Sequence, residues 1–247
     1  MISLIYPAYN PTDSRLNITY PMQELMDIHI NNWRSYSPEQ REQLEVIIVD
    51  DCSPMPIWLC PDFPMNIKAY YIVTDIYWNI SGALNLGHSQ ATHKWHVNLD
   101  FDHILTPNEF DKINNFDKKD NTIYYLKRSK SQTPTIPYKP SPNAFVISSE
   151  NYKRIGGYDE NLAGNGGHND TLIKMLMNKE KYTIDNIDAN LILYDKFLTT
   201  GNRGKKGKDI NKRKVEEIRQ QLSIGTYNNK QKYNYNWKQQ YEHRINT

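Results

Sequence analysis

The sequence predicts an α/β fold with a mixed, mainly parallel central sheet flanked by helices. In its first half, short apolar segments of strand length alternate with segments of helical periodicity. Residues 44–49 form a continuous apolar run rich in β-branched residues, which is typical of a parallel strand covered on both faces. Acidic residues follow two of the expected strands, and ligands of such sheets lie beyond the carboxyl ends of the strands.

Each expected element depends on a local pattern. The first strand is an apolar run that ends at Pro7, and the first helix has apolar residues at helical spacing after Pro21. Gly82 and Gly87 weaken the second helix and indicate close approach to either a ligand or a strand. The expected strands cover residues 2–6, 44–49, 67–73, 95–99, 121–126, 144–147 and 190–194, and the expected helices cover residues 21–34, 79–92, a short segment from 107, 171–177 and 209–224.

Four segments are expected to lack a regular core element. Residues 127–142 are polar and proline-rich, and the length of this loop indicates function or mobility. Two glycine pairs within residues 155–170 predict tight turns over a site. Residues 201–208 form a basic, glycine-rich linker, and residues 227–247 show no core periodicity.

The charge is unevenly distributed along the 247 residues. The formal net charge is +2, but residues 201–247 carry 12 Lys or Arg against 4 Asp or Glu. The preceding part is therefore mildly acidic, and the basic end could contact an anionic glycan, a membrane surface or nucleic acid. We expect residues 1–200 to form one domain and residues 201–247 to form a basic, Tyr-rich extension.

Cysteine usage and hydropathy indicate the compartment. Cys52 and Cys60 give neither a disulfide framework nor a metal-ligand spacing, so both are expected to be reduced. No apolar run reaches the ~18 residues of a membrane span. The first residues also lack the basic segment and long apolar core of a signal peptide. These features predict a cytoplasmic protein without a transmembrane segment, with peripheral contact to a membrane as an alternative.

Asp100 and Asp102 form the strongest candidate metal site. They follow a short buried strand and are spaced to point to the same side. Two neighbouring carboxylates repel each other unless a cation lies between them, and Mg2+ and Mn2+ prefer oxygen ligands. We therefore expect the pair to hold a metal and a diphosphate, whereas an ordinary turn after a strand is the alternative. Asp50 and Asp51 are a second acidic pair at a strand end, for which a helix cap or an Asx-turn is the alternative.

The arrangement of these motifs resembles the family 2 glycosyltransferases of the GT-A fold, over about residues 2–180. The resemblance includes a galactosyltransferase-type Gly-Gly-Tyr-Asp-Glu motif. It rests on the segments 5–10, 46–53, 82–91, 98–102 and 156–160.

The resemblance implies a UDP-sugar donor site that depends on Mn2+ or Mg2+. Asp51 would accept a hydrogen bond from the base, Asp100 would contact the ribose or a metal-bound water, and Asp102 would ligate the metal. His103 adjoins the pair and would either add a ligand or face solvent, and the basic residues Arg203, Lys205 and Lys206 would close over the diphosphate or remain a solvated linker. The implied donor-binding residues are Pro7, Ala8, Tyr9, Asp51, Gly82, Asn85, Asp100, Phe101 and Gly157.

The catalytic base departs from the family pattern. Relatives with this motif usually carry a later Trp-Gly-Gly-Glu-Asp, in which an acidic residue deprotonates the acceptor hydroxyl. Here Gly166–Gly167 match, but Asn165, His168 and Asn169 replace the flanking residues, and the carboxylate of Asp170 falls one place later. The base is expected to be Asp170 or, alternatively, His168, and the cap of the following helix is a structural alternative for Asp170.

These motifs lead to a functional hypothesis with two alternatives. The leading hypothesis is a metal-dependent, hexosyltransferase-like enzyme that moves a sugar to an acceptor hydroxyl, such as one of a glycan, with inversion. Residues 1–105 would bind the nucleotide and residues 106–200 the acceptor. A catalytically inactive nucleotide-sugar or glycan binding module and a nucleotidyltransferase are the alternatives.

Overall fold

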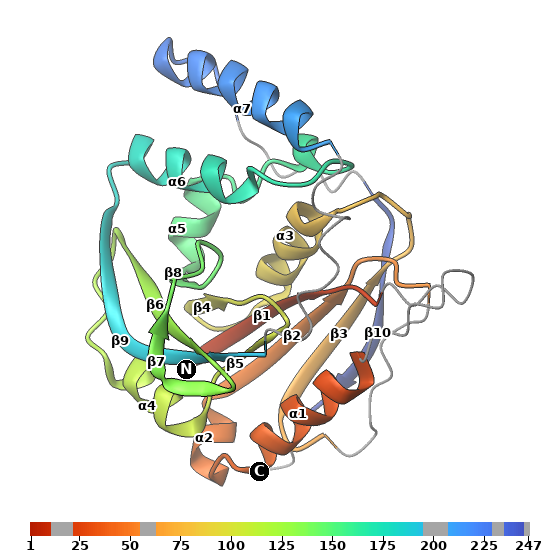
Figure 1. The fold of residues 1–247 in the computed structure, drawn as a ribbon, viewed down its shortest axis with the longest axis vertical. Helices are drawn as coiled ribbons and strands as arrows, with labels where there is room; N and C mark the ends of the chain where they lie inside the picture. Colours follow the sequence, from red (N-terminus) through yellow and green to blue (C-terminus); the bar gives the residue numbers. More distant parts are fainter. Residues whose placement is uncertain (11–21, 55–62, 195–206, 229–234, 245–247) are drawn as a thin grey trace.

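The computed structural model describes residues 1–10, 22–54, 63–194, 207–228 and 235–244. One mixed sheet of ten strands crosses these parts of the chain, with helices on both faces (Figure 1). The predicted α/β fold class is therefore confirmed. The strands are β1 (Ile2–Ala8), β2 (Leu44–Asp50), β3 (Asn66–Ile72), β4 (Trp95–Asn98), β5 (His103–Ile104), β6 (Thr122–Lys130), β7 (Thr133–Tyr138), β8 (Phe145–Ser148), β9 (Thr183–Leu193) and β10 (Trp237–His243).

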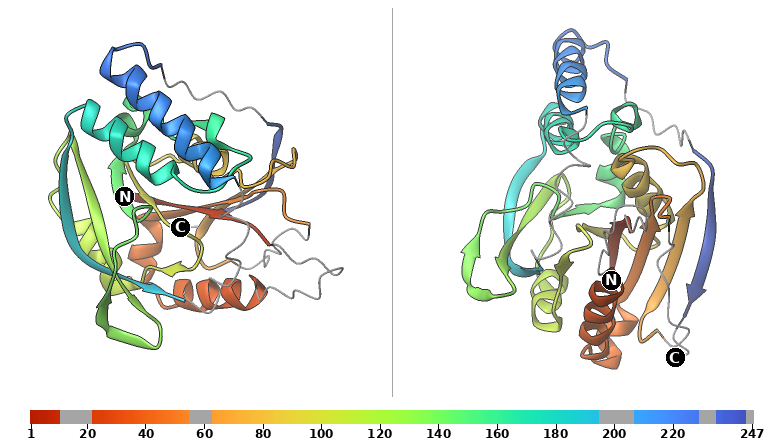
Figure 2. Two further views of the ribbon diagram at one scale, coloured as in Figure 1. Left: turned by 45° about the horizontal axis from the view of Figure 1, so that its top comes forward. Right: turned by 45° about the vertical axis from the view of Figure 1, so that its right-hand side comes forward.

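The helices alternate with these strands as the apolar pattern predicts. α1, α2 and α4 cover one face of the sheet, whereas α3, α5 and α6 lie on the other, with α7 packed outside α6 (Figures 1 and 2). Together they make a three-layer molecule. The helices are α1 (Met22–Arg34), α2 (Pro38–Glu42), α3 (Ile80–Gln90), α4 (Pro107–Asn115), α5 (Ser149–Arg154), α6 (Asn169–Lys179) and α7 (Lys208–Ser223), and a 3-10 turn, η2, covers Glu160–Leu162.

The parallel half of the sheet creates the edge where ligands bind in such folds. The strand order is β10-β3-β2-β1-β4-β8-β6-β9-β5, and β7 pairs with β6. β1 lies parallel to both β2 and β4, and β3 lies parallel to β2. The carboxyl ends of these strands therefore meet at one edge, and the strand order reverses between β1 and β4.

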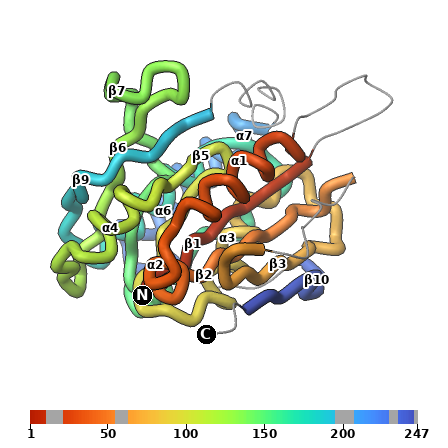
Figure 3. Tube along the Cα trace, turned by 90° about the horizontal axis from the view of Figure 1, so that it is seen from below, coloured from red at the N-terminus to blue at the C-terminus, as the bar shows by residue number. Residues whose placement is uncertain are grey.

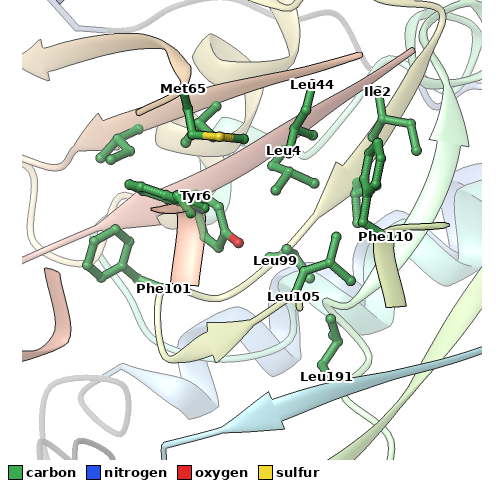
Figure 4. Close-up of a cluster of buried hydrophobic side chains, with 14 of the residues drawn as sticks. Ile2, Leu4, Tyr6, Leu44, Met65, Leu99, Phe101, Leu105, Phe110 and Leu191 are labelled. Carbon is green, nitrogen blue, oxygen red and sulfur yellow. The ribbon is translucent and has the colours of Figure 1, made fainter. Parts of the chain in front are cut away.

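The core below the sheet joins α1 to this edge. Residues of α1 at three- and four-residue spacing are buried, including Leu25, Met26 and Trp33, as the predicted amphipathic helix requires. They belong to one buried apolar cluster with Leu4 and Tyr6 of β1. Figure 4 shows this cluster around the β4–β5 connection, where Leu99, Phe101 and Leu105 lie. The acidic segment after β4 is thus anchored on its apolar side.

Residues 127–142 are not the loop that the sequence predicts. β6 continues to Lys130 and turns into β7, and this hairpin projects from the body of the molecule (Figure 3). Every residue of β7 is exposed, and Pro134 and Pro137 are acceptable in an edge strand because its outer N–H groups need no partner. A ribbon with solvent on both faces shows no apolar alternation, so the pattern could not reveal it.

The C-terminal part contributes to the same sheet. The predicted charged helix over residues 209–224 is present as α7, and β10 pairs antiparallel with β3, although residues 227–247 showed no core pattern. Just before β10, the buried Tyr235 donates a hydrogen bond from its hydroxyl to the carbonyl oxygen of Gly82 (2.5 Å). Residues 235–243 therefore hold the start of α3 as well as the sheet edge.

Among the described residues, no helix combines the length and the apolar character needed to cross a membrane. Cys52 is a free cysteine, and Cys60 lies outside the described residues.

Candidate active site

The end of β2 places Asp51 beside the end of β1. Its backbone N–H donates to the carbonyl oxygen of Ala8 (2.8 Å), and its Oδ2 accepts from the backbone N–H of Asn79 (2.9 Å). Its Oδ1 is buried and has no hydrogen-bond partner in the described part of the chain. Burial, and to a smaller degree the charges of Asp50 and Asp75, raise the pKa of Asp51 to about 7. The free oxygen is suited to accept a hydrogen bond from a ligand.

Asp50 and the end of β1 surround Asp51 at this edge of the sheet. Asp50 Oδ1 accepts from the backbone N–H of Ser53 (2.8 Å), so the Asx-turn alternative is correct for Asp50. Pro7 and Ala8 are the last two residues of β1, and Tyr9 follows them directly. These three predicted donor contacts therefore lie beside Asp51.

The glycines of α3 are explained by packing. A Cβ on Gly87 would lie 2.5 Å from a methyl group of Ile5, so β1 needs this glycine. A Cβ on Gly82 would lie 2.5 Å from both the Asn79 side chain and the Tyr235 ring. The sequence left open whether these glycines approach a ligand or a strand. Gly87 approaches strand β1, whereas Gly82 approaches the N-cap residue Asn79 and the C-terminal residue Tyr235.

The amide of Asn85 holds the glycine loop that contains Gly157. Its Nδ2 donates to the carbonyl of Tyr158 and to a carboxylate oxygen of Glu160, both at 2.9 Å. Its Oδ1 accepts from the Tyr158 N–H (2.9 Å) and from the Tyr152 hydroxyl (2.7 Å). All the hydrogen bonds of this buried amide are made within the protein. The sequence predicted a contact with the sugar donor for Asn85 and did not indicate this structural role.

Asp100, Asp102 and His103 form a cluster after β4. One potential ligand atom from each lies within 4.8 Å of the others. β4 ends at Asn98, and a turn closed by a hydrogen bond from the His103 N–H to the Asp100 carbonyl oxygen (3.0 Å) follows it. This turn, and not the alternation of a strand, therefore places the two carboxylates. His103 Nδ1 lies 2.9 Å from Asp102 Oδ1 and 3.8 Å from Asp100 Oδ2. His103 is buried, so the alternative in which it faces solvent is wrong.

The two carboxylates suit a hard divalent cation better than the imidazole does. Arg128 Nη1 lies 3.2 Å from His103 Nε2. A guanidinium only donates hydrogen bonds, so Nε2 is the acceptor and the ring proton lies on Nδ1, facing Asp102. The imidazole then has no lone pair directed at the cluster. Asp100 and Asp102 fit Mn2+ or Mg2+ as oxygen ligands, and His103 orients Asp102.

Asp100 is supported from the loop before β8. Ser141 Oγ donates to its Oδ2 (3.3 Å) and Asn143 Nδ2 to its Oδ1 (3.4 Å). Burial raises the pKa of Asp100, and the neighbouring Asp102 adds to this, because the charged form is disfavoured there. Sequence reasoning missed Ser141, Asn143 and Arg128, since nothing near them in sequence indicates that they meet residues about 25 to 43 positions away.

The side chain of Phe101, another predicted donor contact, points into the core. Its ring packs against Tyr6 and His29, and its carbonyl oxygen accepts a hydrogen bond from His29 Nε2 (2.7 Å). Phe101 thereby anchors the turn between the two carboxylates.

The loop with the candidate bases precedes α6. His168 is the N-cap with a left-handed φ of 66° and no side-chain cap, and α6 starts at Asn169, so the cap alternative for Asp170 is wrong. Asn169 Oδ1 accepts from Ser81 Oγ (3.0 Å), which ties α6 to α3. Burial raises the pKa of Tyr158 well above its ordinary value, and the carboxylates of Asp100 and Asp170 raise it further. The two sides of the candidate site therefore meet around Tyr158.

Asp170 also opens onto a pocket beside the metal cluster. The pocket shares Ser141 with the support of Asp100, so it borders the carboxylate cluster. Its lining residues are Tyr125, Lys139, Pro140, Ser141, Pro142, Asp170, Lys174 and Asn186. The structure thus places Asp170 within reach of this region, while the predicted basic residues Arg203, Lys205 and Lys206 lie outside the described residues.

The sequence model of Glycosyl transferase family 2 matches residues 30–182, which include Asp51, Asp100, Asp102 and Asp170. No curated protein matches the chain in sequence.

Several solved glycosyltransferases share the fold. GalNAc-T7, solved with UDP, GalNAc and Mn2+, has a TM-score of 0.55 and 13% identity, with 78% of this chain and 43% of that chain covered. The mannosyltransferase PcManGT from Pyrobaculum calidifontis, solved with GDP-Man and Mn2+, has a TM-score of 0.51 and 14% identity, covering 77% and 56%. TarS from S. aureus has a TM-score of 0.48 and 16% identity, covering 78% and 58%. This chain spans about half the length of these proteins. The family model and the likeness to GalNAc-T7 and PcManGT confirm the predicted GT-A fold.

Proposed function

The chain belongs to glycosyl transferase family 2, and we propose that it transfers a sugar from a nucleotide-sugar, with UDP as the nucleotide, to an acceptor hydroxyl. The observation that carries this proposal is the pair of acidic sites on either side of the sheet's switch point. Asp51 follows β2, and the Asp100–Asp102 pair follows β4, with β1 between the two strands. Nucleotides bind at this position in open α/β sheets.

Asp51 is the proposed base-binding residue. Its unpartnered Oδ1 would accept a hydrogen bond from N3–H of uracil, and the adjacent end of β1, with Pro7, Ala8 and Tyr9, would line the base. A buried acceptor without a partner is costly, so a ligand donor there contributes both affinity and specificity. The complexes of GalNAc-T7 with UDP and of PcManGT with GDP-Man support a nucleotide ligand at this fold.

Asp100 and Asp102 are the proposed metal ligands. A bound Mn2+ or Mg2+ would stabilise negative charge on the departing diphosphate as a Lewis acid. Asp102 is oriented by His103, and Asp100 is fixed by Ser141 and Asn143, so both carboxylates are preorganised. The Mn2+ complexes of GalNAc-T7 and PcManGT support this assignment.

Asp170 is the proposed base for an inverting, single displacement. It would take the proton from the acceptor hydroxyl while that oxygen attacks the anomeric carbon and the nucleoside diphosphate leaves. Its carboxylate forms no hydrogen bond or ion pair with another described residue and lies in the pocket next to the cluster. His168, two residues earlier and at the helix N-cap, is the alternative base. The Gly156–Glu160 motif, held by Asn85, would position this wall of the site.

The test compares Asp102→Asn with Asp120→Asn. Asp120 is an exposed carboxylate that forms an ion pair with Lys94 (3.2 Å), so it is a matched control. With Mn2+ present, we expect one or more UDP-sugars to stabilise the wild-type protein in a thermal-shift screen and to release UDP on turnover. Asp102→Asn should lower the rate by about a hundredfold or more, since it removes a charged metal ligand. A wild-type rate in Asp102→Asn, or no stabilisation by any nucleotide-sugar, would contradict the proposal.

A further inference from the structure

The geometry points to an acceptor that carries an anionic group, phosphate or carboxylate, next to the hydroxyl that is glycosylated. This inference deepens the proposed function and rests on it for the role of Asp170. Its structural basis is the pocket between the β6–β7 hairpin and α6. The residues that line it include one carboxylate, that of Asp170, and two lysines, Lys139 and Lys174.

The lysines come from two separate elements. Lys139 follows β7 and is exposed, whereas Lys174 lies in α6 and is half-buried. Neither ammonium group forms an ion pair with any described residue. The Lys174 ammonium lies over the Tyr125 ring, 5.3 Å from its centroid. Two ammonium groups without an ion-pair partner in the lining of one pocket are suited to a ligand anion.

Asp170 and Lys174 are spaced to pair but do not. They are four residues apart on α6, with the acid first, which is the favourable arrangement for a helical ion pair. No such pair forms, because Lys174 turns to Tyr125 and leaves the Asp170 carboxylate open to the pocket. The carboxylate and the two lysines of the pocket therefore do not pair with each other. The carboxylate can accept a hydrogen bond from a hydroxyl, and the lysines can bind an anion. A neutral acceptor would contact Asp170 through its hydroxyl but would leave both lysines without an anionic partner.

The hairpin extends the positive charge beyond the pocket. Residues 122–142 contain four basic residues and no Asp or Glu, and one of the four, Lys127, forms an ion pair with Asp188 (2.7 Å). Arg128 and Lys130 both lie over the Tyr138 ring, at 5.0 and 4.9 Å from its centroid. Arg128 Nε also donates to the carbonyl of Lys139, which fixes the wall that carries this lysine. The approach to the pocket is thus basic and rigidly tied to it.

The experiment measures binding of three related sugars to the full chain. Glucose 6-phosphate, glucuronate and glucose are titrated calorimetrically with Mn2+ and UDP present, so that the proposed donor site does not bind the phosphate. We expect one or both charged sugars to bind at least about tenfold more tightly than glucose, as charge-assisted contacts imply. Preference for glucose 6-phosphate alone identifies a phosphate, and equal preference for glucuronate identifies an anion in general.

Two variants connect this preference to the pocket. The double variant Lys139→Gln/Lys174→Gln should reduce the preference to about twofold or less. Lys179→Gln removes an exposed lysine at the end of the same helix and should retain it. Equal binding of all three sugars, or an unchanged preference in the double variant, would overturn the inference. Binding of UDP to the wild-type protein is recorded separately, so failure of the donor proposal is distinguished from failure of this one.

Discussion

The Arg128 guanidinium and the His103 imidazole face each other across 3.2 Å, and the opposite ring nitrogen of His103 lies 2.9 Å from Asp102. The arginine comes from the β6–β7 hairpin, and the aspartate belongs to the proposed metal site. His103 therefore links the β6–β7 hairpin to a carboxylate of the proposed metal site. Its Nδ1 faces the Asp102 carboxylate as a close polar contact, so the ring orients Asp102 and is not a ligand itself.

This arrangement predicts different outcomes for two substitutions of His103. His103→Asn can still present an N–H near the Nδ1 position, so Mn2+ affinity should stay within about threefold of the wild-type value. His103→Leu removes the polar contact that orients Asp102 and should weaken Mn2+ binding by about 10 to 100-fold. Mn2+ titration followed by electron paramagnetic resonance measures both. A loss in His103→Asn as large as that in Asp102→Asn would mean that the imidazole ligates the metal directly.

The raised pKa of Asp51 predicts pH-dependent donor binding. Burial holds this pKa at about 7, so the carboxyl is mainly protonated at pH 6 and mainly ionised at pH 8. If the ionised form accepts N3–H of uracil, the apparent Kd should fall by about tenfold over this range. UDP-glucose is the suitable probe, because its diphosphate does not titrate there. Asp51→Asn should bind weakly and without pH dependence, and a flat wild-type profile would exclude this role.

Asn85 is expected to stabilise the loop over Gly156–Glu160. Asn85→Ala removes the buried hydrogen bonds that this side chain makes with the N–H and carbonyl of Tyr158 and with the hydroxyl of Tyr152. The free energy of unfolding should fall by about 3 kcal/mol or more. Chemical denaturation measures this, with Asn178→Ala on the exposed end of α6 as the control. A loss under about 1 kcal/mol would show that the loop is held by other contacts.

A buried histidine pair predicts how stability depends on pH. His88 Nδ1 and His96 Nδ1 are 2.9 Å apart, His96 Nε2 faces the carbonyl of His93, and His88 Nε2 faces Asn98 Oδ1. Burial lowers the pKa of His96 to about 4 and that of His88 well below its ordinary value. The unfolded chain takes up these protons first, so the pair's contribution is present above about pH 6.5 and is lost as pH falls toward 4.

The measurement compares variants, because Asp51, with its raised pKa, shifts stability in the opposite direction over the same range. His96→Gln should reduce the slope of unfolding free energy against pH by about 1.4 kcal/mol per pH unit between pH 4.5 and 6. His243→Gln, near the end of β10, should keep the wild-type slope. Identical slopes in His96→Gln and the wild-type protein would contradict the assignment of a neutral buried pair.

The elements that the sequence predicts correctly are those whose pattern reflects burial. β2 is apolar throughout because both of its faces are covered, and α1 shows helical spacing because one of its faces is buried. β7 and β10 are mostly exposed edge strands held by backbone pairing, which leaves no signal in the side chains. Their existence depends on partners distant in the chain.

The candidate site follows the same division. Asp51, Asp100 and Asp102 could be identified because carboxylates at strand ends are a local pattern. The roles of His103 and Asn85 could not, since each depends on a contact with a residue far along the chain: Arg128 in the first case and Tyr158 in the second. Their sequence neighbours do not indicate those contacts.

Strand β10 has a consequence for synthesis of the protein on the ribosome. Its partner, β3, is made about 170 residues earlier, so the outer edge of β3 is open while the remaining strands are translated. An open edge can pair with another nascent chain. Completion of the sheet must therefore wait until residues 237–243 have left the ribosomal tunnel, and truncated translation products would carry this edge into solution.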